Sequence, residues 1–272
     1  MDYTVSGIFR NLKINSRFKF WTIVLILVLV VFSVISFFYY LKRNSSPRIT
    51  VWAWERPENL LFIENRDVAV AFYAGNITFS NSETNFRPRL QPLVVDPGVP
   101  LIAVIRIINK EGGNQLNDSQ LLEAVDLIIK TCLQDNLSGC QLDFDVRSSE
   151  IDFYKKLILE TRKHLPDSLS LSITTLASWC HTGSWVDDLS INEVIPMFYR
   201  LGIDEDLIRR DLVSESFMKA KNCQKSIGVS IDEPLPKKEY LENRRIYIFN
   251  PHPWTSDDFF NIIKKIKTKM SE

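Results

Sequence analysis

The sequence of this 272-residue chain predicts an α/β fold, a small (β/α)8 barrel of the TIM type that follows one N-terminal transmembrane helix. Three observations support this prediction. One long apolar run lies near the N-terminus, eight strand-length apolar runs follow it, and amphipathic segments separate several of these. The predicted parts are a cytoplasmic N-terminal segment, a transmembrane anchor, a linker and the barrel, at residues 1–19, 20–41, 42–47 and 48–272.

Residues 20–41, FWTIVLILVLVVFSVISFFYYL, contain no charged side chain. About 20 such residues cross a bilayer core as a helix, and Trp21, Tyr39 and Tyr40 would lie at its interfaces. A cleaved signal peptide is the alternative, but the run is too long and no small-residue cleavage site follows it. Basic residues are slightly more numerous before the run. We therefore expect a single-pass protein of the inner (cytoplasmic) membrane, with a periplasmic or extracellular barrel.

The eight predicted strands are continuous apolar runs, which is typical of parallel strands covered on both faces. They occupy residues 48–55, 68–74, 101–108, 140–146, 169–176, 193–199, 226–231 and 245–250. Helical spacing of apolar residues predicts helices at 117–136, 148–165, 204–221 and 255–270. Residues 75–100 contain several prolines and no helical pattern, and are a candidate for an extra hairpin. An open doubly wound sheet is the alternative fold, although it usually has fewer strands.

Charge and motifs argue against several classes of partner. Lys plus Arg and Asp plus Glu both number 33, so there is no basic surplus for nucleic acid. Neither GxGxxG nor GxxxxGK[ST] occurs, which argues against a nucleotide. A metal site made of His181, His252 and a carboxylate is conceivable, but no spacing supports it. We expect no cofactor and no metal.

The four cysteines are Cys132, Cys140, Cys180 and Cys223, and none has zinc-binding spacing. An exported domain permits disulfides, and a bond between Cys180 and Cys223 is conceivable, but the sequence does not determine connectivity. Small buried thiols are the expected state of these side chains.

Polar and aromatic residues gather where the predicted strands end, and a barrel carries its chemistry at the carboxyl ends of its strands. In SGCQLDFDV (residues 138–146), Asp143 and Asp145 share one face because side chains alternate along a strand. Two acids this close should not both ionise freely, so one should have a raised pKa, as a sugar-cleaving acid requires. The catalytic candidates are Asp145 as the acid, Asp143, Tyr199 and Glu55. The expected substrate contacts are Trp52, Trp54, Tyr73, Arg106, Trp179, Arg200, Asp232 and Trp254.

The same run resembles the fourth strand of family-18 glycoside hydrolases, the chitinase-like barrels, whose pattern is D-G-x-D-x-D-x-E. Successive motif positions fall on Ser138, Gly139, Gln141, Asp143 and Asp145. PMFY (196–199) similarly resembles the M-x-Y of that family's sixth strand. Two motif aspartates are thus replaced by serine and glutamine, and the terminal glutamate by an aspartate, which withdraws the carboxyl group by about one methylene. The resemblance implies glycan hydrolysis, with Asp143 as the partner of Asp145 or as the group that orients a substrate acetamido group.

A second resemblance covers most of residues 48–260. Segments such as VWAWERPENLLFI, LSITTLASWC and IYIFNPHPWT resemble the bacterial domain-of-unknown-function family 3142. This resemblance implies a bacterial envelope protein and carries no assigned activity.

Two functions follow from these patterns. One is a membrane-anchored enzyme acting on an envelope or extracellular polysaccharide, which the polar strand ends favour. The other is a non-catalytic glycan-binding or scaffold barrel, which the replaced motif acids favour. Asp143 and Asp145 would then close the barrel top through ion pairs to Arg106 or Arg200, and Trp52 would simply fill the barrel.

Overall fold

The computed structural model describes residues 24–33, 47–64, 67–81, 83–110, 116–182, 185–202, 208 and 218–271, except for the side chains of 181 and 182. Two compact units are distinguished, residues 1–46 and 47–272. In the first unit residues 24–33 are helical, and the rest of the predicted span at 20–41 lies outside the described residues. No helix in the described part of the chain is both long and apolar enough to cross a membrane.

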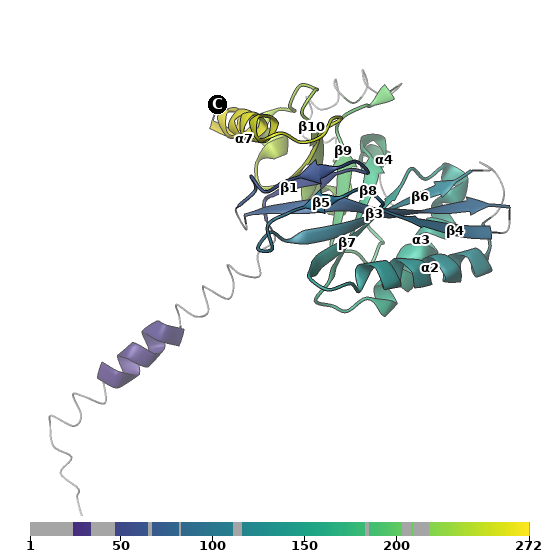
Figure 1. The fold of residues 1–272 in the computed structure, drawn as a ribbon, viewed down its shortest axis with the longest axis horizontal. Helices are drawn as coiled ribbons and strands as arrows, with labels where there is room; N and C mark the ends of the chain where they lie inside the picture. The colour runs from purple at the N-terminus through teal and green to yellow at the C-terminus, as the bar shows by residue number, and fades with distance from the viewer. Residues whose placement is uncertain are drawn as a thin grey trace, which may run out of the picture. The chain divides into compact units, whose positions relative to one another are not determined.

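Eight parallel strands close into a barrel in the second unit (Figure 1). They are β1 (Ile49–Ala53), β3 (Val68–Ser80), β6 (Leu101–Asn109), β7 (Leu137–Phe144), β8 (Ser170–Leu176), β9 (Glu193–Met197), β10 (Ser226–Ser230) and β11 (Arg245–Phe249). Neighbours in the chain are neighbours in the sheet, and β1 pairs with both β3 and β11. The predicted barrel is confirmed and the open sheet is wrong, because the first and last strands are hydrogen-bonded to each other.

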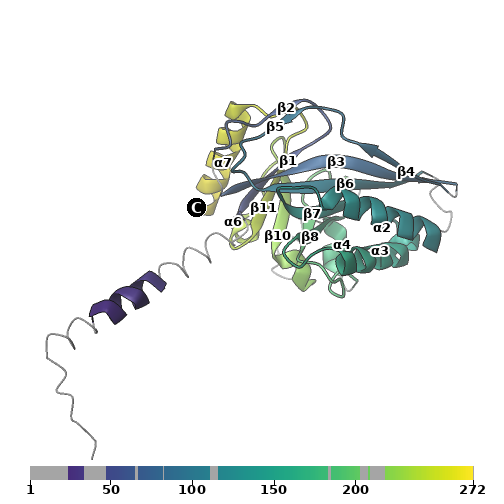
Figure 2. The same ribbon diagram turned by 60° about the horizontal axis from the view of Figure 1, so that its bottom comes forward.

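Helices cover the barrel unevenly. The connections contain α2 (Asp118–Cys132), η1 (Ser148–Glu150), α3 (Ile151–His164), α4 (Ala177–Thr182), η3 (Lys221–Gln224), α6 (Lys238–Leu241) and α7 (Ser256–Ser271). Helices α2 and α3 lie side by side in both views (Figures 1 and 2). Most of the predicted helix at 204–221 lies outside the described residues. The described parts of the β1–β3 and β3–β6 connections hold no helix, but two short paired strands, β2 (Glu58–Asn59) and β5 (Leu93–Val94).

One side of the barrel continues as a ribbon of three strands. Strand β4 (Glu83–Pro88) runs antiparallel to the second half of β3, from Gly75 to Ser80, so residues 75–100 do contain a hairpin. Strand β6 pairs with the other edge of β3 as far as Asn109. Figures 1 and 2 both show β3, β4 and β6 extending together beyond the other strands. This ribbon places polar side chains beside the mouth of the barrel.

Side chains fill the barrel interior, as the packed cores of such barrels require. At the amino ends of the strands, Glu193 accepts hydrogen bonds from the Tyr247 hydroxyl (2.9 Å) and from the Ser226 hydroxyl, and pairs with Arg245 at 2.9 Å. Burial raises the pKa of Glu193 above its ordinary value, and the charge of Arg245 opposes part of this shift. This network closes the end of the barrel opposite the predicted site.

The middle of the barrel is occupied by the indole of Trp52. Its Nε1 donates to Oε1 of Gln141 at 2.7 Å. A Cβ atom on Gly228 would lie 3.1 Å from Cη2 of Trp52, so glycine on β10 provides the space that the ring fills. Gln141 takes the position of a motif aspartate, and here it satisfies the buried indole N–H.

All four cysteines form disulfides, and the expectation of buried thiols is wrong. Cys132 at the end of α2 is bonded to Cys140 on β7, with Cα atoms 5.6 Å apart. Cys180 on α4 is bonded to Cys223 on η3, with Cα atoms 5.9 Å apart. The second bond joins the connection after β8 to the segment before β10. The sequence did not determine either pairing, because it depends on which connections meet in space.

Candidate functional site

A cavity of about 350 Å³ opens at the carboxyl ends of the strands. We call it the mouth cavity; it is lined by Trp52, Trp54, Val104, Arg106, Asp143, Asp145, Thr174, Leu176, Met197, Tyr199, Arg200 and Phe249. Its volume and its mixture of aromatic and polar side chains are typical of small-ligand sites. Seven of the predicted site residues line this cavity.

The two acids of β7 differ in their surroundings. Asp143 is only 6% exposed; its Oδ1 accepts from the Thr174 hydroxyl at 2.6 Å, and its Oδ2 lies 3.3 Å from Arg106 Nη1. Asp145 follows the strand, its side chain is 56% exposed, and its Oδ2 lies 3.1 Å from Arg106 Nη2. Arg106 and Asp143 are register partners on β6 and β7. One guanidinium therefore binds both carboxylates.

Burial raises the pKa of the Asp143 carboxyl. The charge of Arg106 opposes this shift, the charge of Asp145 adds to it, and the hydrogen bond from Thr174 opposes it. The net result is a carboxyl group that retains its proton to higher pH than an ordinary aspartate. The sequence analysis expected one raised pKa in this pair, and the raised one belongs to the buried Asp143.

Tyr199 lies just beyond β9 and borders the same cavity. Its ring stacks on Phe249 with centroids 5.3 Å apart and planes inclined by 5°. Burial raises the pKa of the Tyr199 hydroxyl, and the charge of Asp143 raises it further. The phenol consequently stays neutral and can donate a hydrogen bond into the cavity.

Arg200 has a left-handed backbone, with φ of 51°. This conformation is uncommon for residues other than glycine and is concentrated at functional sites. The Arg200 N–H donates to Oε1 of Glu233 at 2.8 Å, and its guanidinium lies 5.2 Å from the centre of the Phe249 ring. The structure describes the side chains of Arg200, Asp143 and Asp145, and no ion pair joins Arg200 to either acid. Arg106 is the arginine that pairs with both.

A second hollow of about 570 Å³ adjoins the mouth cavity and shares Trp54 and Arg106 with it. We call it the ribbon groove, since it lies along β3, β4 and β6. Two predicted residues, Glu55 and Tyr73, line this groove and not the mouth cavity. Glu55 pairs with Arg87 at 3.2 Å. Because Glu55 lines the ribbon groove, it lies apart from Asp143, Asp145 and Tyr199, which line the mouth cavity.

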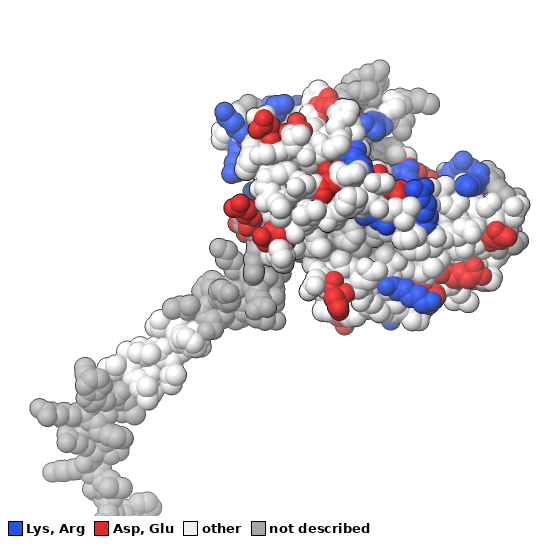
Figure 3. Space-filling view, in the orientation of Figure 1, with Lys and Arg blue, Asp and Glu red and all other residues white. Residues whose placement is uncertain are grey.

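Trp54 forms the boundary between the two hollows. Its ring lies 5.5 Å from that of Tyr73, and the guanidinium of Arg106 lies 5.7 Å from its centre. Indole rings offer flat apolar faces on which a sugar ring can pack. Figure 3 shows basic and acidic atoms close together over the region where Figure 1 labels β3 and β6.

Three predicted substrate contacts lie outside both hollows. Trp179 packs on Trp185 with centroids 5.7 Å apart. Asp232 accepts a hydrogen bond from the Ser230 hydroxyl in the turn after β10. Trp254 is 5% exposed, and its Nε1 donates to the Trp52 carbonyl at 2.8 Å. The prediction placed these three residues at the mouth because each follows a predicted strand, whereas in the structure they hold connections in place.

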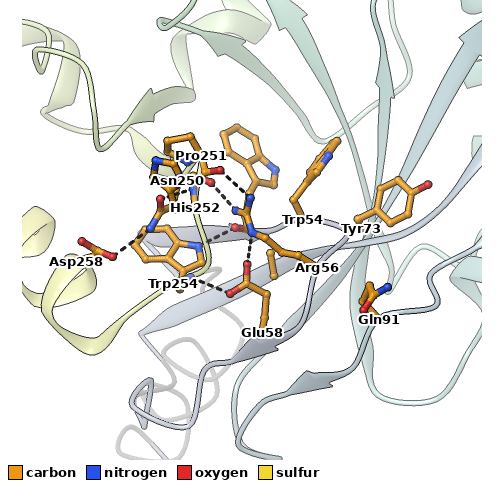
Figure 4. A network of polar contacts seen from close by, with 12 residues as sticks. Trp54, Arg56, Glu58, Tyr73, Gln91, Asn250, Pro251, His252, Trp254 and Asp258 are labelled. Carbon is orange, nitrogen blue, oxygen red and sulfur yellow. Dashed lines mark hydrogen bonds and ion pairs between the residues drawn. The ribbon is translucent and has the colours of Figure 1, made fainter.

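Sequence reasoning missed a network that joins the ends of β1 and β11 (Figure 4). Arg56 Nε lies 2.7 Å from Glu58, and Arg56 Nη2 donates to the Asn250 carbonyl at 2.6 Å. The second oxygen of Glu58 accepts the N–H of Trp254 at 2.9 Å. Glu58 is buried, and burying an acid is costly unless it is paired in this way. The network fixes the closing seam of the barrel beside Trp54.

Arg89 performs a related task beside the connections after β1 and β3, whose described parts hold no helix. Its Nη1 donates to the Trp54 carbonyl and its Nη2 to the Arg56 carbonyl, each at 2.6 Å. The Trp54 carbonyl also accepts the N–H of Arg56 at 2.8 Å, so Arg89 adds to the backbone bonding at these strand ends. Among the described residues, no group of three or more His, Cys, Asp and Glu side chains is placed to hold a metal ion.

Comparisons with known proteins include a likeness to a solved glycoside hydrolase. No protein-family model matches the chain, and no curated protein matches it. A GH113 β-mannanase from Alicyclobacillus acidocaldarius, solved in complex with ManMIm, is similar at 7% identity with a TM-score of 0.47. The similarity covers 78% of this chain and 88% of that chain. The barrel assignment rests on the closed order of eight parallel strands.

Proposed function

We propose that this chain is a glycoside-hydrolase-like barrel that binds a glycan in the mouth cavity and cleaves it. The observation that carries the proposal is the pair of unlike carboxyl groups on one strand face: buried Asp143 with a raised pKa, and exposed Asp145. Glycosidases need one protonated and one ionised carboxyl group at the scissile bond. Trp54 and Phe249 supply apolar surface for a sugar ring in the same cavity.

The surroundings of the acids suggest their roles. Asp143 donates its proton to the glycosidic oxygen as the bond to the anomeric carbon breaks. The exposed Asp145 faces the positive charge that develops on the sugar. Water then adds to the anomeric carbon and returns a proton to the carboxyl pair. The neutral Tyr199 hydroxyl donates a hydrogen bond in the transition state. These roles exchange the two acids relative to the sequence prediction, because burial favours protonation of Asp143.

A second candidate function is glycan binding without cleavage. The observation in its favour is that Arg106 binds both acids, at 3.3 and 3.1 Å. The charge of Arg106 opposes protonation of Asp143, and a site without a protonated carboxyl group has no proton donor. The same aromatic residues and the same cavity would then serve recognition alone.

Glycan binding and hydrolysis by the purified chain separate the two functions. The natural chain and Asp145→Asn are incubated with chitin, mannan, xylan and peptidoglycan oligosaccharides, and binding and new reducing ends are measured. We expect binding by both proteins and at least about 100-fold slower cleavage by Asp145→Asn, the scale of a lost catalytic carboxylate. Binding without cleavage by the natural chain would establish the second function, and no binding to any glycan would reject both.

We also propose that the barrel works outside the cytoplasm, held by the apolar run at residues 20–41. The two disulfides support this location, because such bonds persist in oxidising compartments and are rare in the cytosol. The anchor rests on the sequence alone. Membership of domain-of-unknown-function family 3142 and a remote relation to family-18 glycoside hydrolases are part of the same proposal, and both rest on the quoted motifs.

A further inference from the structure

The ribbon groove is lined mainly by polar side chains, and the proposed chemistry does not use it. Across its three strands, Asn76 on β3 is the register partner of Arg87 on β4 and of Arg106 on β6. The next row along the ribbon is Asn85, Thr78 and Ile108. Cross-strand neighbours lie close enough to contact one ligand together.

A β-bulge gives the groove its composition. The register of β3 against β6 shifts between Tyr73 and Gly75. In a regular strand, Tyr73 and Asn76 would point to opposite faces, since they are three residues apart. The bulge brings them to one face, and the Tyr73 hydroxyl donates to Oδ1 of Asn76 at 2.7 Å. Bulges of this kind are over-represented next to active sites, where they redirect a side chain.

The amide of Asn76 is held in one orientation. Its Oδ1 accepts from Tyr73, and its Nδ2 donates to the Thr78 hydroxyl at 2.8 Å. Tyr73 and Thr78 are only 4% and 7% exposed, so both partners are fixed by packing. One amide hydrogen and one acceptor lone pair of Asn76 remain for a ligand. Polar groups fixed before binding lose little entropy on contact with a ligand.

We propose that the ribbon groove is a second sugar subsite, so that the substrate is a chain of at least two units spanning the groove and the mouth cavity. This inference rests on the proposed function of the cavity. The two hollows share Trp54 and Arg106, and each has the volume of a small-ligand site. The bound glycan passes over Trp54. One sugar unit lies beside Asp143, and the next is hydrogen-bonded by Asn76, Asn85 and Arg87.

Binding of an oligosaccharide ladder by the full chain tests this subsite. Chito-, manno- and xylo-oligosaccharides of one to six units are titrated, and affinity is followed by calorimetry. All proteins in this test also carry Asp143→Asn, so that the ligand is bound and not cleaved. For the series that binds, we expect the hexamer to bind at least about tenfold more tightly than the monomer, because it adds the hydrogen bonds of the groove. Asn76→Ala should reduce this ratio by about three- to tenfold, the size of one net hydrogen bond. Thr78→Val, which removes a partner of Asn76, should reduce it in the same direction.

Thr84→Val is the matched control. Thr84 lies on β4 in the same ribbon, pairs with Phe79 and does not line the groove. It receives the same substitution as Thr78, and the length ratio should not change. Binding without any gain from length would overturn the subsite while leaving the proposed function intact. A gain that persists in both groove variants would also overturn it, and absence of binding at every length in all series would overturn the proposed function itself.

Discussion

Replacing Asp143 with asparagine is expected to slow glycan hydrolysis by about two to four orders of magnitude and to stabilise the fold at neutral pH. Asparagine has the shape of the carboxyl group but cannot donate the proton that the proposed mechanism requires. Burial raises the pKa of Asp143, so ionising this carboxyl group costs more free energy in the folded chain than in the unfolded chain. The neutral amide avoids that cost, while Arg106 keeps Asp145 as its partner.

The pH dependence of this stabilisation has a defined sign. Between the ordinary pKa of aspartate, 3.8, and the raised pKa in the fold, the folded chain binds more protons than the unfolded chain. The natural chain therefore loses stability as pH rises through this window, and the loss is complete above the raised pKa. The variant lacks this loss, so the difference in free energy of unfolding should grow with pH. Glu193, whose pKa burial also raises, contributes equally to both proteins.

Urea unfolding at pH 4, 5.5 and 7 measures the stability difference, and reducing-end assays measure the rate. A matched comparison is Asp145→Asn, whose side chain is exposed and should change stability little. Two results would contradict this account: an Asp143→Asn protein that is less stable than the natural chain at pH 7, or one that cleaves glycan at the natural rate.

Removal of the Cys180–Cys223 disulfide should lower the free energy of unfolding by about 4 kcal/mol. The two cysteines are 43 residues apart, so the bond restricts a long loop in the unfolded chain. Cys132 and Cys140 are only 8 residues apart, and the same reasoning gives about 2.5 kcal/mol for that bond. Alanine replaces both members of a pair, which avoids placing a hydroxyl group at a buried position.

Chemical unfolding of the two double variants, Cys180→Ala/Cys223→Ala and Cys132→Ala/Cys140→Ala, measures both effects. All four cysteines are almost fully buried, so the loss of side-chain packing is similar in the two variants and the difference reports the loops. If loss of the Cys132–Cys140 bond lowers the free energy of unfolding more than loss of the Cys180–Cys223 bond, loop restriction does not explain the stabilisation. Mass spectrometry of the natural chain under non-reducing conditions confirms that the bonds are present.

The strands could be predicted because each is a continuous apolar run, and their order follows because consecutive strands of a chain are usually neighbours in a sheet. The common face of Asp143 and Asp145 follows from the alternation of side chains along β7. Their different exposure does not, because it depends on where β7 ends: Asp143 lies within the strand and Asp145 just beyond it.

The ribbon groove could not be predicted, because a one-residue register shift after Tyr73 reverses the face that every later side chain of β3 occupies. Regular alternation would have placed Asn76 away from Tyr73. Similarly, Trp254 follows the last strand as a mouth residue would, yet its indole N–H bonds the carbonyl of Trp52. The contacts of Trp254 have no local sequence signal, since its partners lie about 200 residues earlier in the chain.

A crystal structure of Asp143→Asn with a bound oligosaccharide tests the central claim most directly, since this variant should bind the glycan without cleaving it. The account predicts a sugar ring in the mouth cavity between Trp54 and Tyr199, with its glycosidic oxygen within hydrogen-bonding distance of the side chain at position 143. A sugar bound elsewhere on the barrel, with the mouth cavity filled only by solvent, would contradict it.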